Sequence, residues 1–150
     1  MPGALQWGVT GQQLAVGAVV RRGKDVLLIS DPPDWALPGG AVEPGEPLLA
    51  KVTQESGFAS VLPERLLWVA RYPAGGVDYE MLGFEVTGVG PHDGSGAWVP
   101  LPEAVQRLEH MWFAPIRDPA VAYLTGRARV ATLWTWTDLN EPPLTHPRAG

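Results

Sequence analysis

The sequence of 150 residues contains no cysteine and little positive charge. Without cysteine the chain has no disulfides, thiolate metal sites or thiol nucleophiles, which fits a reducing compartment. Eleven lysines and arginines against 16 aspartates and glutamates give a formal net charge of −5, so the basic face of a general nucleic-acid binder is excluded. The apolar run at residues 14–20 is far shorter than a bilayer span, and Arg21 and Arg22 follow it, whereas a signal peptide has its positive charge first. We expect a cytoplasmic protein whose partners are neither nucleic acid nor membrane.

The rest of the composition is typical of one globular domain. Hydrophobic residues make up 45% of the chain and charged residues 18%, a balance that differs from that of disordered chains. A chain of this length is long enough to bury one sizeable core. We predict a single domain over residues 1–150, with a core from about 13 to 137 and a loose tail over 138–150.

The hydrophobic pattern predicts an α/β (α+β) fold in which helices pack on the faces of a mixed sheet. Strands are predicted at 13–22, 26–30, 66–72, 78–86, 97–101 and 129–137. One helix is predicted to begin at Pro47 and to stop at Gly57, and two more are predicted at 102–109 and 118–126. Gly39 and Gly40 precede the first helix, where glycine lets the backbone turn or approach a ligand.

Two stretches of the chain carry a family resemblance. The sequence WALPGGAVEPGE, residues 35–46, leads into a short helix that ends with ESGF at Phe58, and AWVPLPEAVQRL follows at residues 97–108. These segments resemble the Nudix hydrolase family, in outline over residues 14–124. The resemblance implies an α/β/α sandwich that hydrolyses a nucleoside diphosphate linked to another group. It also implies magnesium or manganese ions held by the glutamates of the family motif, because clustered carboxylates gather such ions.

The first half of the family motif is kept, whereas the second half is changed. Gly40 and Glu46 match the first glycine and glutamate of the motif, and Glu55 matches the second glutamate of its final pair. Gln54 replaces the first glutamate of that pair, and the helix is four residues shorter than in the motif. Lys51 lies one turn before Glu55, where the resemblance puts a metal-binding and catalytic glutamate. We expect its ammonium group to repel divalent ions and to pair with Glu55.

The candidate site residues follow from this comparison. The candidate catalytic and metal-binding residues are Glu46 and Glu55, and the candidate ligand-binding residues are Gly39, Gly40, Lys51 and Trp35. Glu46 is alternatively a cap for the helix N-terminus. A rebuilt metal site would need a further carboxylate from Glu80 or Glu85, and the odd spacing of these two places them on opposite faces of a strand.

Aromatic residues add two further candidates. Tyr72, Tyr79 and Trp98 would either line a groove in which a base stacks or pack in the core. Trp134 and Trp136 fall on one side of the last predicted strand. This stripe either covers the sheet of its own domain, which we favour, or forms a homodimer contact.

Two functions remain open. The first is a Nudix-type hydrolase of nucleoside diphosphate-linked compounds whose metal site is eroded and whose activity is expected to be weak or absent. It would use magnesium or manganese if active, and otherwise no metal. The second is a non-catalytic module that binds a nucleotide-like small molecule, or a protein partner, through the same groove. In that module Lys51 would contact a phosphate directly as a point charge.

Overall fold

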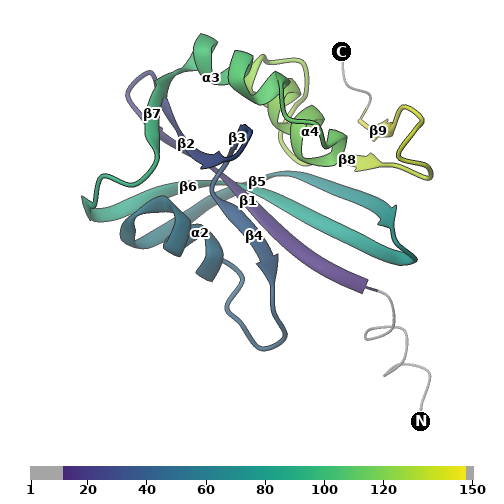
Figure 1. Ribbon diagram of the computed structural model, residues 1–150, viewed down its shortest axis with the longest axis horizontal. Helices are drawn as coiled ribbons and strands as arrows, with labels where there is room; N and C mark the ends of the chain where they lie inside the picture. The colour runs from purple at the N-terminus through teal and green to yellow at the C-terminus, as the bar shows by residue number, and fades with distance from the viewer. Residues whose placement is uncertain (1–11, 148–150) are drawn as a thin grey trace.

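The computed structural model describes residues 12–147, which fold around a nine-stranded mixed sheet (Figure 1). The main path of the sheet runs β3-β2-β1-β6-β5-β8-β9, with β4 paired to β1 and β7 paired to β2. The pairs β1–β6 and β5–β8 are parallel, and the other pairs are antiparallel. The strands are β1 (Gln12–Arg22), β2 (Asp25–Asp31), β3 (Asp34–Ala36), β4 (Gly39–Val42), β5 (Phe58–Ala74), β6 (Val77–His92), β7 (Ala97–Pro100), β8 (Thr132–Thr135) and β9 (Leu144–His146).

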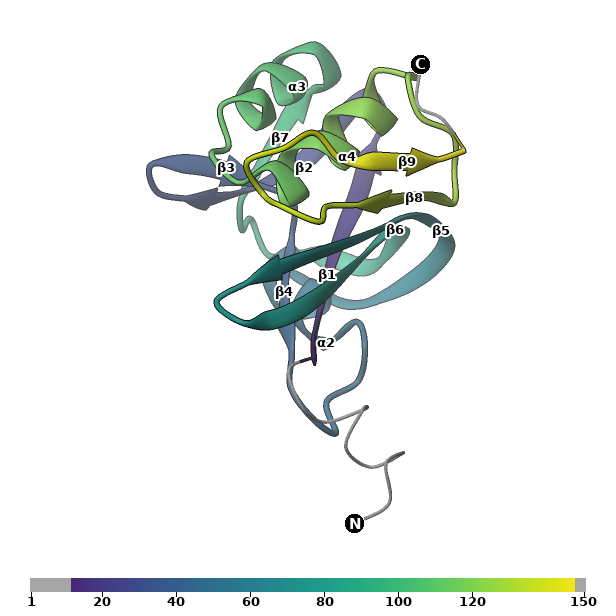
Figure 2. The ribbon, with the colours of Figure 1, turned by 90° about the vertical axis from the view of Figure 1, so that its right-hand side faces the viewer.

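Helices cover both faces of the sheet. Helix α2 (Ala50–Ser56) lies on one face, and α3 (Leu101–Glu109) and α4 (Ala114–Leu124) lie on the other (Figures 1 and 2). This arrangement confirms the predicted α/β/α sandwich with a mixed sheet. None of the helices within residues 12–147 is long and apolar enough to cross a bilayer.

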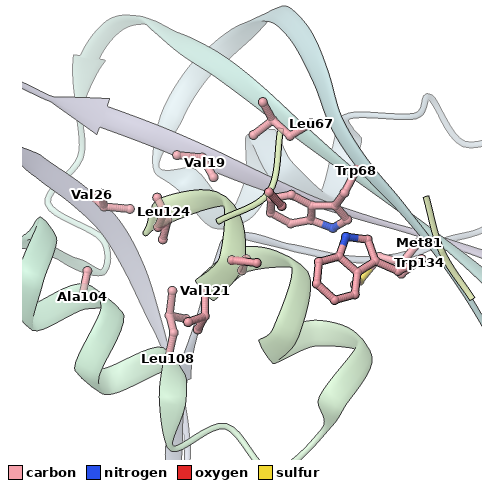
Figure 3. Close-up of a cluster of buried hydrophobic side chains, with 14 of the residues drawn as sticks. Val19, Val26, Leu67, Trp68, Met81, Ala104, Leu108, Val121, Leu124 and Trp134 are labelled. Atoms are coloured by element: carbon pink, nitrogen blue, oxygen red, sulfur yellow. The ribbon is translucent and has the colours of Figure 1, made fainter. Parts of the chain in front are cut away.

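Each face of the sheet has its own hydrophobic core. The smaller core lies under α2 and consists of Val16, Ala18, Val20, Leu27, Val52 and Val86. The larger core lies under α3 and α4 and includes Val19, Leu67, Trp68, Leu108 and Trp134 (Figure 3). Residues of β1 therefore alternate between the two cores, as expected for a strand that is buried on both faces.

The two tryptophans of the last predicted strand pack inside the larger core. Trp134 is 6% exposed and Trp136 is 3% exposed, and their rings stack with centroids 6.1 Å apart. The prediction that this stripe covers the sheet of its own domain is confirmed. Within the tail expected to be loose over 138–150, residues 144–146 form β9, which pairs antiparallel with β8, and residues 148–150 lie outside the described part of the chain. That pairing satisfies the edge of β8, a tertiary effect that the polar composition of the tail does not reveal.

Several predicted boundaries differ from those observed. The hairpin β5–β6 is much longer than the predicted strands 66–72 and 78–86, because its antiparallel pairing continues beyond the apolar stretch as far as Phe58 and His92. Helix α2 begins at Ala50 and not at Pro47, since residues 47–49 form a turn closed by the bond from the Ala50 N–H to the Pro47 carbonyl. Helix α4 begins four residues before the predicted Asp118.

Candidate functional site

The Gly-Gly segment at the start of β4 places that strand close to β1. A Cβ atom at Gly39 would clash with the carbonyl oxygen of Val16, so a glycine is required for this approach. A Cβ atom at Gly40 would lie 3.6 Å from Cγ of Lys51, which shows that the aliphatic stem of Lys51 lies over Gly40. The two glycines therefore position β4 and leave room for the lysine above it.

The ammonium group of Lys51 is paired with the glutamate of the turn before α2. Its Nζ lies 3.7 Å from Oε2 of Glu46, and the two side chains are 33% and 23% exposed. Oε1 of Glu46 accepts the backbone N–H of Glu43 at 3.1 Å, and the Glu46 N–H donates to the Glu43 carbonyl at 2.9 Å. Glu46 therefore closes the turn and holds Lys51. It does not cap α2, whose N-cap residue is Leu49 and has no side-chain cap.

Glu55 and Gln54 lie on the exposed side of α2. The expected pair between Lys51 and Glu55 is not formed, because the Lys51 side chain extends back over Gly40 toward Glu46. The opposite side of the helix is buried through Val52 and Ser56. The structure thus brings Glu46, Gly40 and Lys51 together and leaves Glu55 as a solvated carboxylate.

The C-terminal end of α2 is fixed by a histidine from the end of β6. The Gly94 N–H donates to Nδ1 of His92 at 3.1 Å, so the proton of the neutral ring lies on Nε2, which is 2.8 Å from the Ser56 carbonyl oxygen. Gly57 follows with φ 79°, the left-handed conformation that ends helices. This clamp fixes the orientation of the helix that carries Lys51.

The two strand glutamates lie on opposite faces of the sheet, as their spacing predicted. Glu80 shares a face with α2 and is paired with Arg71, with Nε and Oε2 3.3 Å apart. Glu85 lies on the α4 face, where it accepts a hydrogen bond from the Tyr123 hydroxyl at 3.1 Å. Two arginines also contact Glu85, at 3.5 Å and 3.4 Å, namely Arg21 and Arg65. Only Glu80 therefore lies on the same side of the sheet as Lys51.

These carboxylates do not fit the metal that the fold family implies. Residues 12–147 contain no group of three or more His, Cys, Asp or Glu side chains that could hold a metal ion. Glu46 and Glu80 are each paired with a basic residue, and Glu55 stands apart from both ion pairs. Magnesium prefers several hard oxygen ligands in a near-octahedral array, and this arrangement does not supply them.

An open cleft of about 620 Å³ lies at the end of the sheet where the β5–β6 hairpin approaches β8. This volume is in the range of small-molecule sites. The rings of Tyr72 and Tyr79 are parallel in its wall, with centroids 5.2 Å apart, and Trp136 also lines it. Burial, with a smaller effect of the neighbouring Tyr79, raises the pKa of the Tyr72 phenol. The remaining lining residues are Gln13, Leu14, Arg71, Pro73, Asp78, Glu80, Thr135 and Thr137.

The other aromatic candidates lie elsewhere. Trp35 packs against the larger core, with the guanidinium of Arg107 4.8 Å from its ring centroid. Trp98 lies beside Phe58 and under Arg22, whose guanidinium is 4.2 Å from its ring centroid. Neither tryptophan lines the cleft. Tyr72 and Tyr79 thus line the cleft while also packing with the larger core, and whether a base stacks there stays a prediction.

The register of the sheet connects the cleft with Lys51. Leu14 of the cleft pairs with Val42 of β4, and two residues further along the same pair of strands Val16 faces Gly40, over which Lys51 lies. Two residues along a strand and one strand across correspond to about 8 Å. On that side of the sheet a small molecule can therefore reach Lys51 and the part of the cleft formed by Leu14 and Glu80, whereas the rings of Tyr72 and Tyr79 face the opposite side.

Arg71 and Thr135 are site residues that sequence reasoning missed. They are register partners on β5 and β8, and both line the cleft. The segments that carry them are more than 60 residues apart, and only their pairing brings them together. Arg71 is the one charged residue of the apolar stretch 66–72, but its partner could not be read without the register.

Comparison with known proteins identifies the fold. No family model matches the chain, and no curated protein matches it. Among solved structures, a Nudix hydrolase from Nitrosomonas europaea superposes with a TM-score of 0.63 at 20% identity, covering 79% of this chain and 93% of its own. A mutator MutT protein from Bacillus halodurans gives 0.59 at 16% identity, covering 91% and 99%. A UDP-X diphosphatase gives 0.59 at 17% identity, covering 89% and 75%. The chain therefore has the Nudix fold, which confirms the resemblance read from the sequence at the level of architecture.

Proposed function

We propose that this chain is a Nudix-fold protein that binds a nucleotide-like small molecule and hydrolyses it weakly or not at all. The observation that carries the proposal is the ion pair between Lys51 and Glu46. It puts a positive charge, and a neutralised carboxylate, at the point where hydrolysis of a nucleoside diphosphate derivative would need clustered negative charge.

Lys51 is suited to contact a phosphate of the ligand. Its side chain is 33% exposed, and its one ion-pair partner within the described part of the chain, at 3.7 Å, leaves donors of the ammonium for further hydrogen bonds. A lysine binds phosphate as a point charge and needs no bridging cation. The rest of the ligand would then extend over Leu14 and Glu80, on the same face of the sheet as Lys51.

The competing function is an active hydrolase with a rebuilt magnesium or manganese site. It is favoured by one observation, that Glu80 shares the α2 face of the sheet with Glu46. Such a site would require both glutamates to leave their basic partners, and Glu55 would have to complete it. The present pairing of the residues does not fit that arrangement, so the non-catalytic reading is preferred.

Two measurements test the proposal. A panel of nucleoside diphosphate derivatives with magnesium or manganese should give no product, or only slow turnover. Efficient turnover that is lost in Glu55→Gln would establish the hydrolase instead.

In the presence of a chelator, a nucleoside diphosphate should bind to the wild-type protein and more weakly to Lys51→Met. The control is Lys24→Met, which removes the same charge from an exposed turn between β1 and β2. Equal affinity of the two variants would remove Lys51 from the site.

A further inference from the structure

A second cation, Arg71, stands at the edge of the cleft with most of its donors free. Its side chain is 57% exposed, and its ion pair with Glu80 is a single contact from Nε at 3.3 Å. Within residues 12–147 neither terminal nitrogen of this guanidinium makes a hydrogen bond. Guanidinium groups with free terminal donors bind phosphate oxygens in a forked geometry.

Arg71 lies on the same face of the sheet as Lys51. Its chain neighbours Ala70 and Tyr72 are both buried in the larger core under α4, so the Arg71 side chain between them projects to the α2 face. Gly40, which carries Lys51 above it, pairs with Val16 of the smaller core on that same face. The two cationic side chains therefore lie on the same face of the sheet.

The register places the two cations three strands apart on this face, with Lys51 offset by two residues along β4 from the row that contains Arg71. Val42 of β4, Leu14 of β1, Glu80 of β6 and Arg71 of β5 are successive cross-strand partners. Three strand spacings across the sheet and two residues along β4 separate the backbones beneath the two cations by about 16 Å. The side chains of Lys51 and Arg71 are long and flexible, so their charged groups can come closer than this. Leu14 and Glu80 form the floor between them.

We infer that Arg71 is a second anion contact, and that the ligand carries a chain of phosphates or two separate anionic groups that extend from Lys51 to Arg71. This inference rests on the proposed function, because it takes Lys51 as the first phosphate contact. Each cation is held beside the row by its own glutamate, Glu46 or Glu80, so both are in place before the ligand arrives. A ligand with a single phosphate would use only one of them.

An acidic residue of the cleft, Asp78, should affect the two cations differently. Asp78 lines the cleft and has no ion-pair partner among residues 12–147, and it adds a negative charge near Arg71. Removing that charge in Asp78→Asn should therefore strengthen binding of an anion that reaches Arg71, and should leave binding of an anion at Lys51 nearly unchanged. Thr135, the register partner of Arg71, can donate its hydroxyl to the same anion.

The test uses inorganic phosphate, pyrophosphate and tripolyphosphate as probes, titrated calorimetrically into the full chain with a chelator present. Tripolyphosphate should bind roughly tenfold more tightly than phosphate, since it gains charge-assisted hydrogen bonds to a second cation. Arg71→Met should remove most of that gain and leave the affinity for phosphate unchanged. Arg71→Gln serves as a second variant, and thermal unfolding checks that both are folded.

The matched control is Arg65→Met. Arg65 lies on the same strand, is 54% exposed and is paired with a β6 glutamate at 3.4 Å, but its partner Glu85 lies on the opposite face of the sheet. Equal losses in Arg65→Met and Arg71→Met would show a general charge effect and overturn the inference. Phosphate binding through Lys51 with no effect of Arg71→Met would overturn the inference and leave the proposed function standing. Failure of all three anions to bind the wild-type protein would overturn both.

Discussion

Replacing Glu46 by glutamine distinguishes two roles of this residue, because a metal ligand and a partner of Lys51 predict opposite changes in ligand affinity. If Glu46 held a divalent ion, the loss of its charge would weaken ligand binding, because the metal would leave with it. If Glu46 only holds Lys51, the loss of its charge frees the ammonium for a phosphate, and ligand binding becomes tighter. We expect Glu46→Gln to bind pyrophosphate more tightly than the wild-type protein in the presence of a chelator.

The magnitude follows from the geometry of the pair. At the observed 3.7 Å, two unit charges in water attract each other by about 1 kcal/mol, and measured pairs at protein surfaces give about 0.2–1 kcal/mol. Both side chains are partly exposed, so the lower range applies. A gain of about 0.2 to 0.5 kcal/mol corresponds to about a 1.4- to 2.3-fold increase in affinity. Glutamine keeps an oxygen that can accept the Glu43 N–H, so the turn should be preserved.

Isothermal titration calorimetry at low and high salt measures this effect. Glu43→Gln is the matched control, because it removes the same charge from the same turn and leaves the pair between Lys51 and Glu46 intact. Its effect should be smaller and should vanish at high salt, since it acts only through the screened field. Weaker binding in Glu46→Gln that magnesium restores would refute the reasoning and show that Glu46 is a metal ligand.

Three further outcomes are expected. Gly83→Ala should destabilise the fold by about 1–3 kcal/mol in urea unfolding, because a Cβ there would clash with an indole ring, whereas Gly17→Ala at its register partner has open space and should be nearly neutral. The pKa of Tyr72 is raised in the folded state, so the stabilising contribution of its neutral phenol is present below its ordinary pKa and is lost as pH rises through the folded value. The free energy of unfolding should therefore fall above about pH 10. Tyr72→Phe should reduce that fall. Lys51→Glu should gain affinity for manganese in a direct binding titration, and an unchanged affinity would mean that the lysine does not keep the ion away.

The architecture could be predicted because its signals are local. Valine-rich alternation marks β1 around Val16, and the pair Gly75-Gly76 has positive φ at both positions, as a two-residue hairpin requires. The long ends of β5 and β6 were missed because residues such as Pro63 and Gly90 disfavour strands on their own. The cross-strand hydrogen bonds of a 17-residue strand override that local preference.

The candidate site was only partly predictable, since its contacts join distant segments. The position of Lys51 on the helix was read correctly from the motif, but spacing alone suggested Glu55 as its partner. The helix begins at Ala50, so Lys51 lies in its first turn and extends back to Glu46 in the preceding turn, which a helical wheel does not represent. Arg71 became visible as a site residue only when the register of the sheet placed it in the cleft.

The way α2 is held explains how the fold accommodates a lysine on this helix. The helix is attached through Val52 and Ser56, which are both buried, and through the bond between His92 and its last turn. Positions 51 and 55 lie outside that contact, so their charges contribute little to the packing of the helix. A cluster of acids at such positions would repel itself unless a cation were bound, whereas a lysine paired with Glu46 needs no ion. The segment can therefore keep its shape without any metal, and its shape alone gives no reason to assign it the chemistry of a metal-dependent hydrolase.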